Sequence, residues 1–216
     1  PNVGIVEVPD ARLKKLTELV KPQKTVPTTI EFTDIAGIVK GASKGEGLGN
    51  QFLSHIRQVD AILHVVRCFE DENITHVAGA VDPIADIETI NVELILADME
   101  TVDRRFARVE KLAKQKDKEA LVEYEALAKI KRAFERELPA RSVELTEEEK
   151  KKIHGLHLLT MKPMLYVANV GEEDLLEGGE NEHVKKVREY AESQGSNVIV
   201  VCAKIEAEIA ELDGEE

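Results

Sequence analysis

The sequence has only two cysteines and no long hydrophobic stretch, and each absence excludes a class of protein. Cys68 and Cys202 lie far apart, and neither belongs to a C-x-x-C pair. A framework of several disulfides is therefore excluded, and a reduced, cytoplasmic setting is the simplest interpretation. No apolar run approaches the roughly 20 residues that a membrane-spanning helix needs. No signal peptide is visible, but the chain begins with Pro1, so we expect its natural start to lie upstream.

Positive charge is scarce as well. The chain carries 29 lysines and arginines against 42 aspartates and glutamates, a formal net charge of -13. A field of this sign does not steer a protein onto nucleic acid, so any contact with RNA requires a local basic patch. Hydrophobic residues make up 43% of the 216 positions, which is enough for a core. This length suits either one large domain or one domain that carries an insertion.

Apolar segments separated by helical patterns predict an α/β fold with a mainly parallel sheet. We expect strands at 3–8, 28–33, 61–69, 164–170 and 197–203. The continuous apolar run from Ala61 to Phe69 is typical of a strand that is covered on both faces. His64 lies inside that run, and we interpret it as a core histidine whose hydrogen bonds are satisfied.

A long helical pattern interrupts this alternation. Asp82 and Pro83 mark its start, since Asp caps a helix well and Pro suits the first helical position. The pattern continues to about Leu138, apart from a polar turn at 115–118, and Pro139 ends it. We therefore predict a charged hairpin of two antiparallel helices. Further on, Thr146 and Glu149 have the spacing of a capping box.

The first chemical motif is Asp34-Ile35-Ala36-Gly37, at the end of the second predicted strand. In a phosphate-binding site, a carboxylate in this place orients Mg²⁺, often through water, and the glycine amide can face the γ-phosphate. An isolated D-x-x-G is common, however, and an ordinary strand-end turn explains it more simply. The glycines that follow, up to Gly49, permit the backbone changes that a switch loop requires.

The second motif, Asn169-Val170-Gly171-Glu172, also follows a predicted strand. We expect Asn169 to brace neighbouring loops and Glu172 to read the edge of a nucleotide base. Guanine presents two adjacent donors that suit Asp, whereas Glu is one methylene longer and should recognise guanine less well. Val170 replaces the lysine that is usual at this position. A polar loop with no ligand is the alternative explanation.

The third motif is Cys202-Ala203-Lys204, after the last predicted strand, where the amide of Ala203 can meet a base. Taken alone it is weak, and Lys204 at a solvated helix start is the simpler interpretation. All three motifs follow predicted parallel strands, and open α/β sheets bind ligands at that edge. Their order along the chain makes them, together, the signature of a nucleotide site.

With these motifs in this order, the chain resembles the YchF, or Obg-like ATPase, family in the Obg branch of translation-factor GTPases. The most specific stretch runs from Ile30 to Asp71, IEFTDIAGIVKGASKGEGLGNQFLSHIRQVDAILHVVRCFED. The resemblance implies a Ras-like P-loop NTPase core at 1–90 and 140–216, with a coiled-coil-like helical insertion at 91–139. It also implies a C-terminal TGS domain, which we expect to lie beyond this chain.

The resemblance further implies an activity and its partners. We expect an ATP-hydrolysing switch that prefers ATP to GTP, uses Mg²⁺, and is linked to ribosomes and stress responses in the cytoplasm. The residues carried over are Asp34 and Gly37 for catalysis, with Asp34 acting on the metal through water. The base-binding residues carried over are Asn169, Val170, Glu172, Cys202 and Ala203.

Two features depart from Ras-type hydrolases. Ile38 stands where they place a glutamine that orients the attacking water, and an alkyl group cannot do so. Hydrolysis should therefore be slow, or another group must act; Lys40, Ser43 and His55 lie nearby in sequence. In addition, G-x-x-x-x-G-K-[ST] occurs nowhere in the chain. The family places that P-loop before Pro1, so we expect this chain alone to bind nucleotide weakly and to be inactive.

Two alternatives stay open. One is a preference for GTP, as in the wider Obg branch. The other is a ribosome-binding module in which nucleotide turnover is incidental, with the hairpin as its surface. The hairpin's basic residues are Lys111, Lys114, Lys116, Lys118, Lys129, Lys131 and Arg132, interleaved with acids. A solvated helical face is the simpler interpretation of such a pattern.

Overall fold

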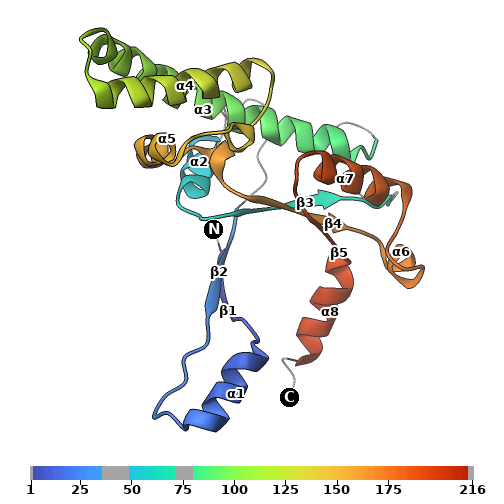
Figure 1. Ribbon diagram of the computed structural model, residues 1–216. Helices are drawn as coiled ribbons and strands as arrows, with labels where there is room; N and C mark the ends of the chain where they lie inside the picture. Colours follow the sequence, from blue (N-terminus) through green and yellow to red (C-terminus); the bar gives the residue numbers. More distant parts are fainter. Residues whose placement is uncertain (1, 36–48, 72–79, 214–216) are drawn as a thin grey trace. The chain divides into compact units, whose positions relative to one another are not determined.

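The computed structural model describes residues 2–35, 49–71 and 80–213, which form two compact units (Figure 1). The first unit holds β1 (Asn2–Glu7), α1 (Ala11–Val20) and β2 (Thr29–Asp34). β1 and β2 pair antiparallel, with Asn2 opposite Asp34 and Glu7 opposite Thr29. The parallel arrangement expected for strands separated by a helix is therefore wrong in this unit.

The exposure of α1 explains the antiparallel pairing. A parallel crossover lays its helix across a face of the sheet, where the apolar side of the helix is buried. α1 has no buried residue, and Lys21 ends it in the left-handed conformation with a φ of 48°. The chain then returns beside β1, where the Val8 amide donates to the Thr28 carbonyl at 2.7 Å. α1 is thus part of the connection of a long hairpin.

The second unit is built on a sheet of three parallel strands in the order β3-β4-β5. This confirms the parallel pairing predicted for β3 (Ile62–Arg67), β4 (Met164–Asn169) and β5 (Val198–Val201). Its helices are α2 (Gly49–Arg57), α3 (Pro83–Lys114), α4 (Lys118–Glu135), α5 (Glu147–Ile153), α6 (Glu172–Leu176), α7 (Glu182–Ser193) and α8 (Ala203–Asp213), with short 3₁₀ turns η2 (Ala140–Ser142), η3 (His154–Leu156) and η4 (Leu159–Met161).

Only one face of this sheet is covered by the described residues. α3 packs on β3, and α7 packs on β4 and β5, so both helices lie on the same side (Figure 1). Val66 and Tyr166 face these helices and are buried, whereas Leu63 and Val65 on the other face are 43% and 62% exposed. The prediction that 61–69 is covered on both faces is therefore wrong for the described part of the chain. Within that part, no helix combines the length and apolarity needed to cross a membrane.

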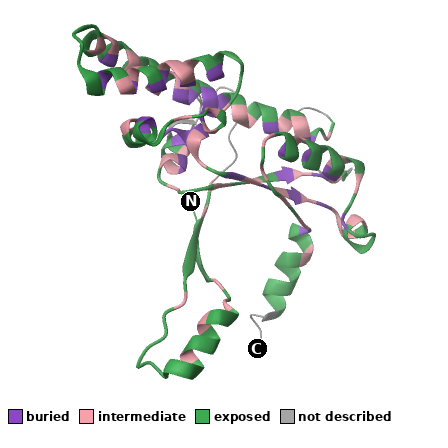
Figure 2. Ribbon diagram, in the orientation of Figure 1, coloured by how far each residue is buried: buried purple, intermediate pink, exposed green. Residues whose placement is uncertain are grey.

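The predicted helical hairpin is present. Asp82 caps α3 by accepting from the Ala85 amide at 3.1 Å, and Pro83 occupies the first turn. α3 continues through position 91 without a break, so the start expected for the insertion falls inside a helix. The facing sides of α3 and α4 form a core with the segment that follows them (Figure 2). The buried side chains of this core include Val102, Val109, Leu127, Ile130, Phe134 and Ile153.

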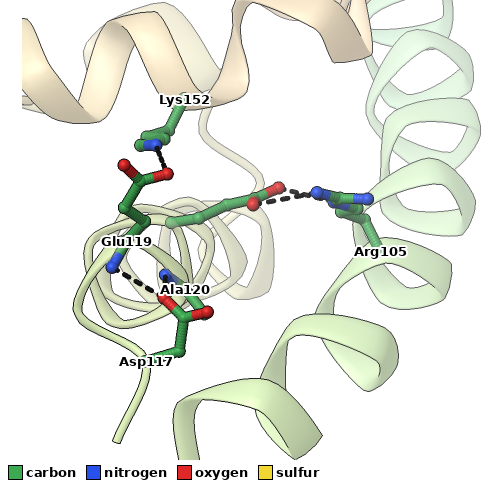
Figure 3. Close-up of polar contacts among 6 residues, drawn as sticks. Arg105, Asp117, Glu119, Ala120 and Lys152 are labelled. Carbon is green, nitrogen blue, oxygen red and sulfur yellow. Dashed lines mark hydrogen bonds and ion pairs between the residues drawn. The ribbon is translucent and has the colours of Figure 1, made fainter.

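Ion pairs join the helices of the hairpin to α5. Arg105 on α3 binds Glu123 on α4 through two bonds of 2.5 and 3.0 Å, although Glu123 is only 7% exposed. Figure 3 shows this pair beside the contact from Lys152 on α5 to Glu119 on α4, 2.9 Å long. The Asp117 side chain in the same view accepts from the amides of Glu119 and Ala120, which starts α4. Arg105 of the hairpin and Lys152 of α5 are thus both paired within the fold.

A buried carboxylate fixes the base of the hairpin to the sheet. Asp98 on α3 accepts from the Leu159 amide at 2.9 Å, the Thr160 amide at 2.8 Å and the Thr160 hydroxyl at 2.6 Å. Burial raises the pKa of Asp98, although these hydrogen bonds act in the opposite direction. Because Thr160 lies just before β4, α3 is held against the start of that strand.

Candidate functional site

The carboxyl ends of β4 and β5 bring the second and third motifs together. Asn169 is the last residue of β4, and its side-chain oxygen accepts from the amide of Ala203 at 2.9 Å. Ala203 begins α8, so Asn169 satisfies one of the amides left free at the start of that helix. The loop-bracing contact expected of Asn169 is therefore made to the third motif. Because the Ala203 amide donates its hydrogen bond to Asn169, the amide that was expected to meet a base is already hydrogen-bonded within the protein.

Glu172 and Lys204 form an ion pair across the two loops. The Lys204 ammonium lies 3.3 Å from a carboxylate oxygen of Glu172, with side chains 68% and 41% exposed. The hydrogen bond that Lys204 donates to the Glu172 carboxylate raises the pKa of Lys204. Lys204 does lie at an exposed helix start, as the sequence suggested, but it also holds the carboxylate that was expected to read a base. The charged side chains of Glu172 and Lys204 therefore both face solvent near the end of β4.

Val170 and Cys202 contribute backbone and packing at this edge. Both are 2% exposed, so their side chains face the core. The Val170 amide donates to the Val201 carbonyl at 2.8 Å, which continues the ladder past the end of β4. Of the five residues expected at a base, these two can reach a ligand only through main-chain atoms. The side chains available to a ligand are those of Asn169 and Glu172, together with Lys204.

The two cysteines flank β4 on opposite sides. Cys68 follows β3 and Cys202 follows β5, so about two strand spacings, roughly 9–10 Å, separate their strands. A disulfide requires Cα atoms within about 7 Å, which rules out a bond between them. Cys68 is fully buried, and burial raises the pKa of its thiol to about 12. A thiol with that pKa is inert at neutral pH.

The sequence analysis missed the contribution of the loop before α7. Asn181 caps α7 by accepting from the Val184 amide at 2.9 Å, and its amide group donates to the Cys68 carbonyl at 2.7 Å. One side chain thus joins the end of β3 to the start of α7. Nearby, His183 approaches Glu70 at 3.4 Å. The cap could have been predicted, because an Asn directly before a helical pattern is a cap signal. The contact of Asn181 with the Cys68 carbonyl could not, because it joins residues far apart in sequence.

His64 differs from its interpretation as a satisfied core histidine. It lies on β3 beside Tyr166, with ring centroids 5.8 Å apart. Its Nδ1 is buried and has no hydrogen-bond partner among the described residues. Burial lowers the pKa of His64 to about 4, although the charge of Asp86 acts in the opposite direction. The apolar sequence around His64 correctly indicated burial but gave no information on its partners.

The phosphate-side motif belongs to the first unit. Asp34 ends β2 and is exposed, while Gly37, Ile38, Lys40 and Ser43 lie outside the described residues. His55 lies on α2 and is half-buried. Within the described ranges, no group of three or more His, Cys, Asp or Glu side chains could hold a metal ion. A lone carboxylate at a strand end nevertheless fits Mg²⁺ that is bound mainly through phosphate oxygens and water.

Similarity to known proteins decides the family. The chain is 73% identical over all 216 of its residues to the ribosome-binding ATPase YchF of Bacillus subtilis (strain 168). The chain belongs to the YchF family. The YchF protein of Escherichia coli O157:H7, also named a ribosome-binding ATPase, is 54% identical over the same residues. In both comparisons the chain spans 59% of the relative's length.

Two further comparisons agree with membership of the YchF family. A family model described as 50S ribosome-binding GTPase matches residues 9–98. The structure of the Schizosaccharomyces pombe YchF GTPase superposes with a TM-score of 0.76 at 37% identity, covering 94% of this chain and 55% of that one. The P-loop GTPase fold expected from the sequence is thereby confirmed. The names of these YchF relatives differ in the nucleotide, ATP for the bacterial proteins and GTP for the fungal one.

Proposed function

We propose that this chain supplies most of the nucleotide-hydrolysing core of an ATP-dependent molecular switch that acts on ribosomes. The observation that carries the proposal is the meeting of two motif loops at one sheet edge, through Asn169 and Ala203 at 2.9 Å. Ligands of open α/β sheets bind at that edge. The names of the bacterial relatives, ribosome-binding ATPases, support the same activity and partner.

Glu172 favours adenine over guanine in this proposal. An Asp in its place would accept both donors of guanine, whereas the longer Glu reaches past that position. Its pairing with Lys204 at 3.3 Å holds the carboxylate toward α8 and away from a two-point contact with guanine. Binding of adenine is not weakened by this position of the carboxylate, because adenine presents only one donor on that edge and makes no two-point contact with a carboxylate.

We further propose that Asp34 and Gly37 act on the phosphates of the nucleotide, as their D-x-x-G motif indicates. The carboxylate of Asp34 would hold Mg²⁺ through water, and Mg²⁺ supplies charge neutralisation on the phosphates when bound. Ile38 offers no hydrogen bond to an attacking water, so intrinsic hydrolysis is slow. The loop after Asp34 responds to the terminal phosphate, which makes the protein a switch.

The base assignment is tested by Glu172→Asp. The experiment uses this chain extended at its N-terminus with the P-loop segment of the family, and calorimetry of ATP and GTP binding with Mg²⁺. We expect the parent to bind ATP more tightly. The variant should move the ratio of the two Kd values toward GTP about tenfold, or about 1.4 kcal/mol.

Two controls accompany this titration. Glu173→Asp makes the same change one residue along and should leave the ratio as it is. The 216-residue chain without the extension should bind either nucleotide weakly, because the lost cradle supplies most phosphate contacts. Tighter binding of GTP by the parent would replace ATP with GTP as the substrate.

A second candidate function is ribosome binding through the hairpin, and the structure narrows its surface. Lys129 pairs with Glu149 at 2.9 Å and Lys131 with Asp103 at 2.8 Å, so both are engaged within the fold. The remaining lysines of the group gather where α3 ends and α4 begins: Lys111, Lys114, Lys116 and Lys118. This hairpin tip is the best candidate surface for an RNA-rich partner.

Co-sedimentation with ribosomes tests the hairpin tip. Changing Lys111, Lys116 and Lys118 to Glu should reduce the ribosome-bound fraction at least tenfold at moderate salt. The reason is that three cations able to contact RNA phosphates are replaced by anions that repel them. The matched control changes Lys185, Lys186 and Arg188 on α7 to Glu, which alters the net charge equally. Equal loss in both triple variants, or loss in neither, would remove the tip from the interface.

A further inference from the structure

Arg67 is a cation at the sheet edge of the candidate site, and none of the three motifs contains it. It is the last residue of β3 and lies directly opposite Asn169, the last residue of β4, in the parallel register. Val66 and Cys68, on either side of Arg67, are buried, and α3 packs on this strand. Because side chains alternate along a strand, Arg67 projects from the face that the described helices leave uncovered.

Asn169 projects from the same face of the sheet. Its neighbours Ala168 and Val170 are buried, so alternation along β4 turns Asn169 the other way. The Cys68 amide donates to the Asn169 carbonyl at 2.8 Å, which joins the two strand ends. Adjacent strands lie about 4.8 Å apart. The side chains of Arg67 and Asn169 therefore leave the sheet next to each other, at the edge where the motif loops meet.

Phe69 holds the guanidinium of Arg67 near the end of β3. The Nε of Arg67 donates to the Phe69 carbonyl at 3.1 Å, and the guanidinium carbon lies 4.8 Å from the centroid of the Phe69 ring. Among the described residues, no carboxylate forms an ion pair with Arg67, and its terminal nitrogens make no hydrogen bond. Arg67 is half-buried, so these two nitrogens form a partly desolvated fork that is suited to an anion.

The charges around this edge indicate which part of a nucleotide needs the fork. Glu70 and Asp71 follow β3, and the range 172–174 after β4 is acidic throughout. Lys204, which follows β5, already pairs with a carboxylate of that range at 3.3 Å. A nucleotide brings several negative charges to an edge that is itself acidic. Arg67 is a cation there that no described carboxylate neutralises, so it suits the phosphates and not the neutral base.

We propose that Arg67 binds a phosphate group of the nucleotide. This inference rests on the proposed function, in which the base lies over the loops that follow β4 and β5. β3 lies on the opposite side of β4 from β5, so the phosphates of such a nucleotide extend over the end of β3. There the planar guanidinium matches two phosphate oxygens. The second motif has Val170 where a lysine is usual, and Arg67 returns a cation to this edge from the neighbouring strand.

The test uses the same P-loop-extended chain with Mg²⁺, and measures Kd for ATP by calorimetry and for adenosine by NMR titration. Arg67→Gln should weaken ATP binding about tenfold or more, and change the Kd for adenosine by no more than about twofold, because only ATP carries phosphates. Arg67→Lys keeps the charge without the planar fork, and should recover part of the affinity for ATP. Equal weakening of ATP and adenosine would overturn the proposal, because it would mean that Arg67 only supports the fold of the strand ends.

Arg104→Gln is the matched control. Arg104 is an exposed arginine on α3, beyond Asp98, which is bound to the segment before β4 at the opposite end of that strand. This variant should bind ATP and adenosine like the parent. A parent that binds neither ATP nor GTP contradicts the proposed function, and this inference with it. A parent that binds ATP, together with an Arg67→Gln variant that binds ATP equally well, overturns only the role of Arg67.

Discussion

At the residue scale, His64 is a titratable group that is buried within an apolar strand. Its Nδ1 is buried without a hydrogen-bond partner in the described part of the chain, and its ring lies beside that of Tyr166. Burial disfavours the charged imidazolium, so the pKa of His64 falls from 6.5 to about 4. The unfolded chain has no such restriction, and folding therefore becomes coupled to pH at this position.

The sign of that coupling can be measured. Because the folded pKa lies below the unfolded one, the stability linked to neutral His64 is fully present above pH 6.5. It is lost as pH falls toward about 4. Between pH 7 and pH 5, His64→Phe should reduce the loss in the free energy of unfolding by about 1–2 kcal/mol, measured by urea denaturation. The effect stays in this range because the side chain as a whole is only half-buried. A variant with the same pH dependence as the parent would show that His64 is not the group responsible.

The arrangement of the candidate site was predictable in part at this scale. The contact of Asn169 with a neighbouring motif loop was expected, because strand-end motifs recur in a fixed order along the chain. The ion pair of Glu172 with Lys204 was not found, since nothing in the intervening residues specifies it. The burial of Val170 was also missed, although Val170 continues the alternation of buried Met164, Tyr166 and Ala168 along β4.

At the element scale, helix starts were predicted well because their signals are local. Thr146 and Glu149 form the capping box, with reciprocal bonds of 3.1 and 3.2 Å. α7 spans Glu182–Ser193 after the cap at Asn181. Strand direction was predicted less well, since the antiparallel pairing of β1 and β2 depends on where α1 packs and not on the strand sequences.

The hairpin offers a prediction at this scale. Glu123→Ala should lower the free energy of unfolding by about 1–3 kcal/mol in urea denaturation, because it leaves the Arg105 guanidinium unpaired beside the α3–α4 core. Glu100→Ala removes the exposed pair with Arg104 and should cost at most about 0.5 kcal/mol. If both changes cost the same, the buried contact has no special part in holding α3 to α4.

At the scale of the whole molecule, burial is unevenly distributed. The second unit holds every buried residue of the described chain, whereas β1, α1 and β2 hold none (Figure 2). A two-stranded hairpin with no buried face has little independent stability. The apolar side chains exposed there include Val3, Ile5, Ile30 and Phe32.

Hydrogen exchange should reveal this difference. Amides of the β1–β2 ladder should open with free energies of at most about 1–2 kcal/mol, while those of β4 approach the global value. Exchange followed by mass spectrometry on the 216-residue chain compares the two ladders in one sample. Comparable protection of both would mean that the first unit is stabilised by contacts beyond its own residues.

The sequence by itself determined the family, the positions of the helices and the motifs at the strand ends, because each depends on neighbouring residues or on order along the chain. Only the tertiary structure decided which sheet face is covered, which way β1 and β2 pair, and that Lys204 holds Glu172. It alone showed that Asp98 holds α3 to the segment before β4. These features arise from contacts between residues far apart in sequence, and composition or periodicity carries no record of such pairs.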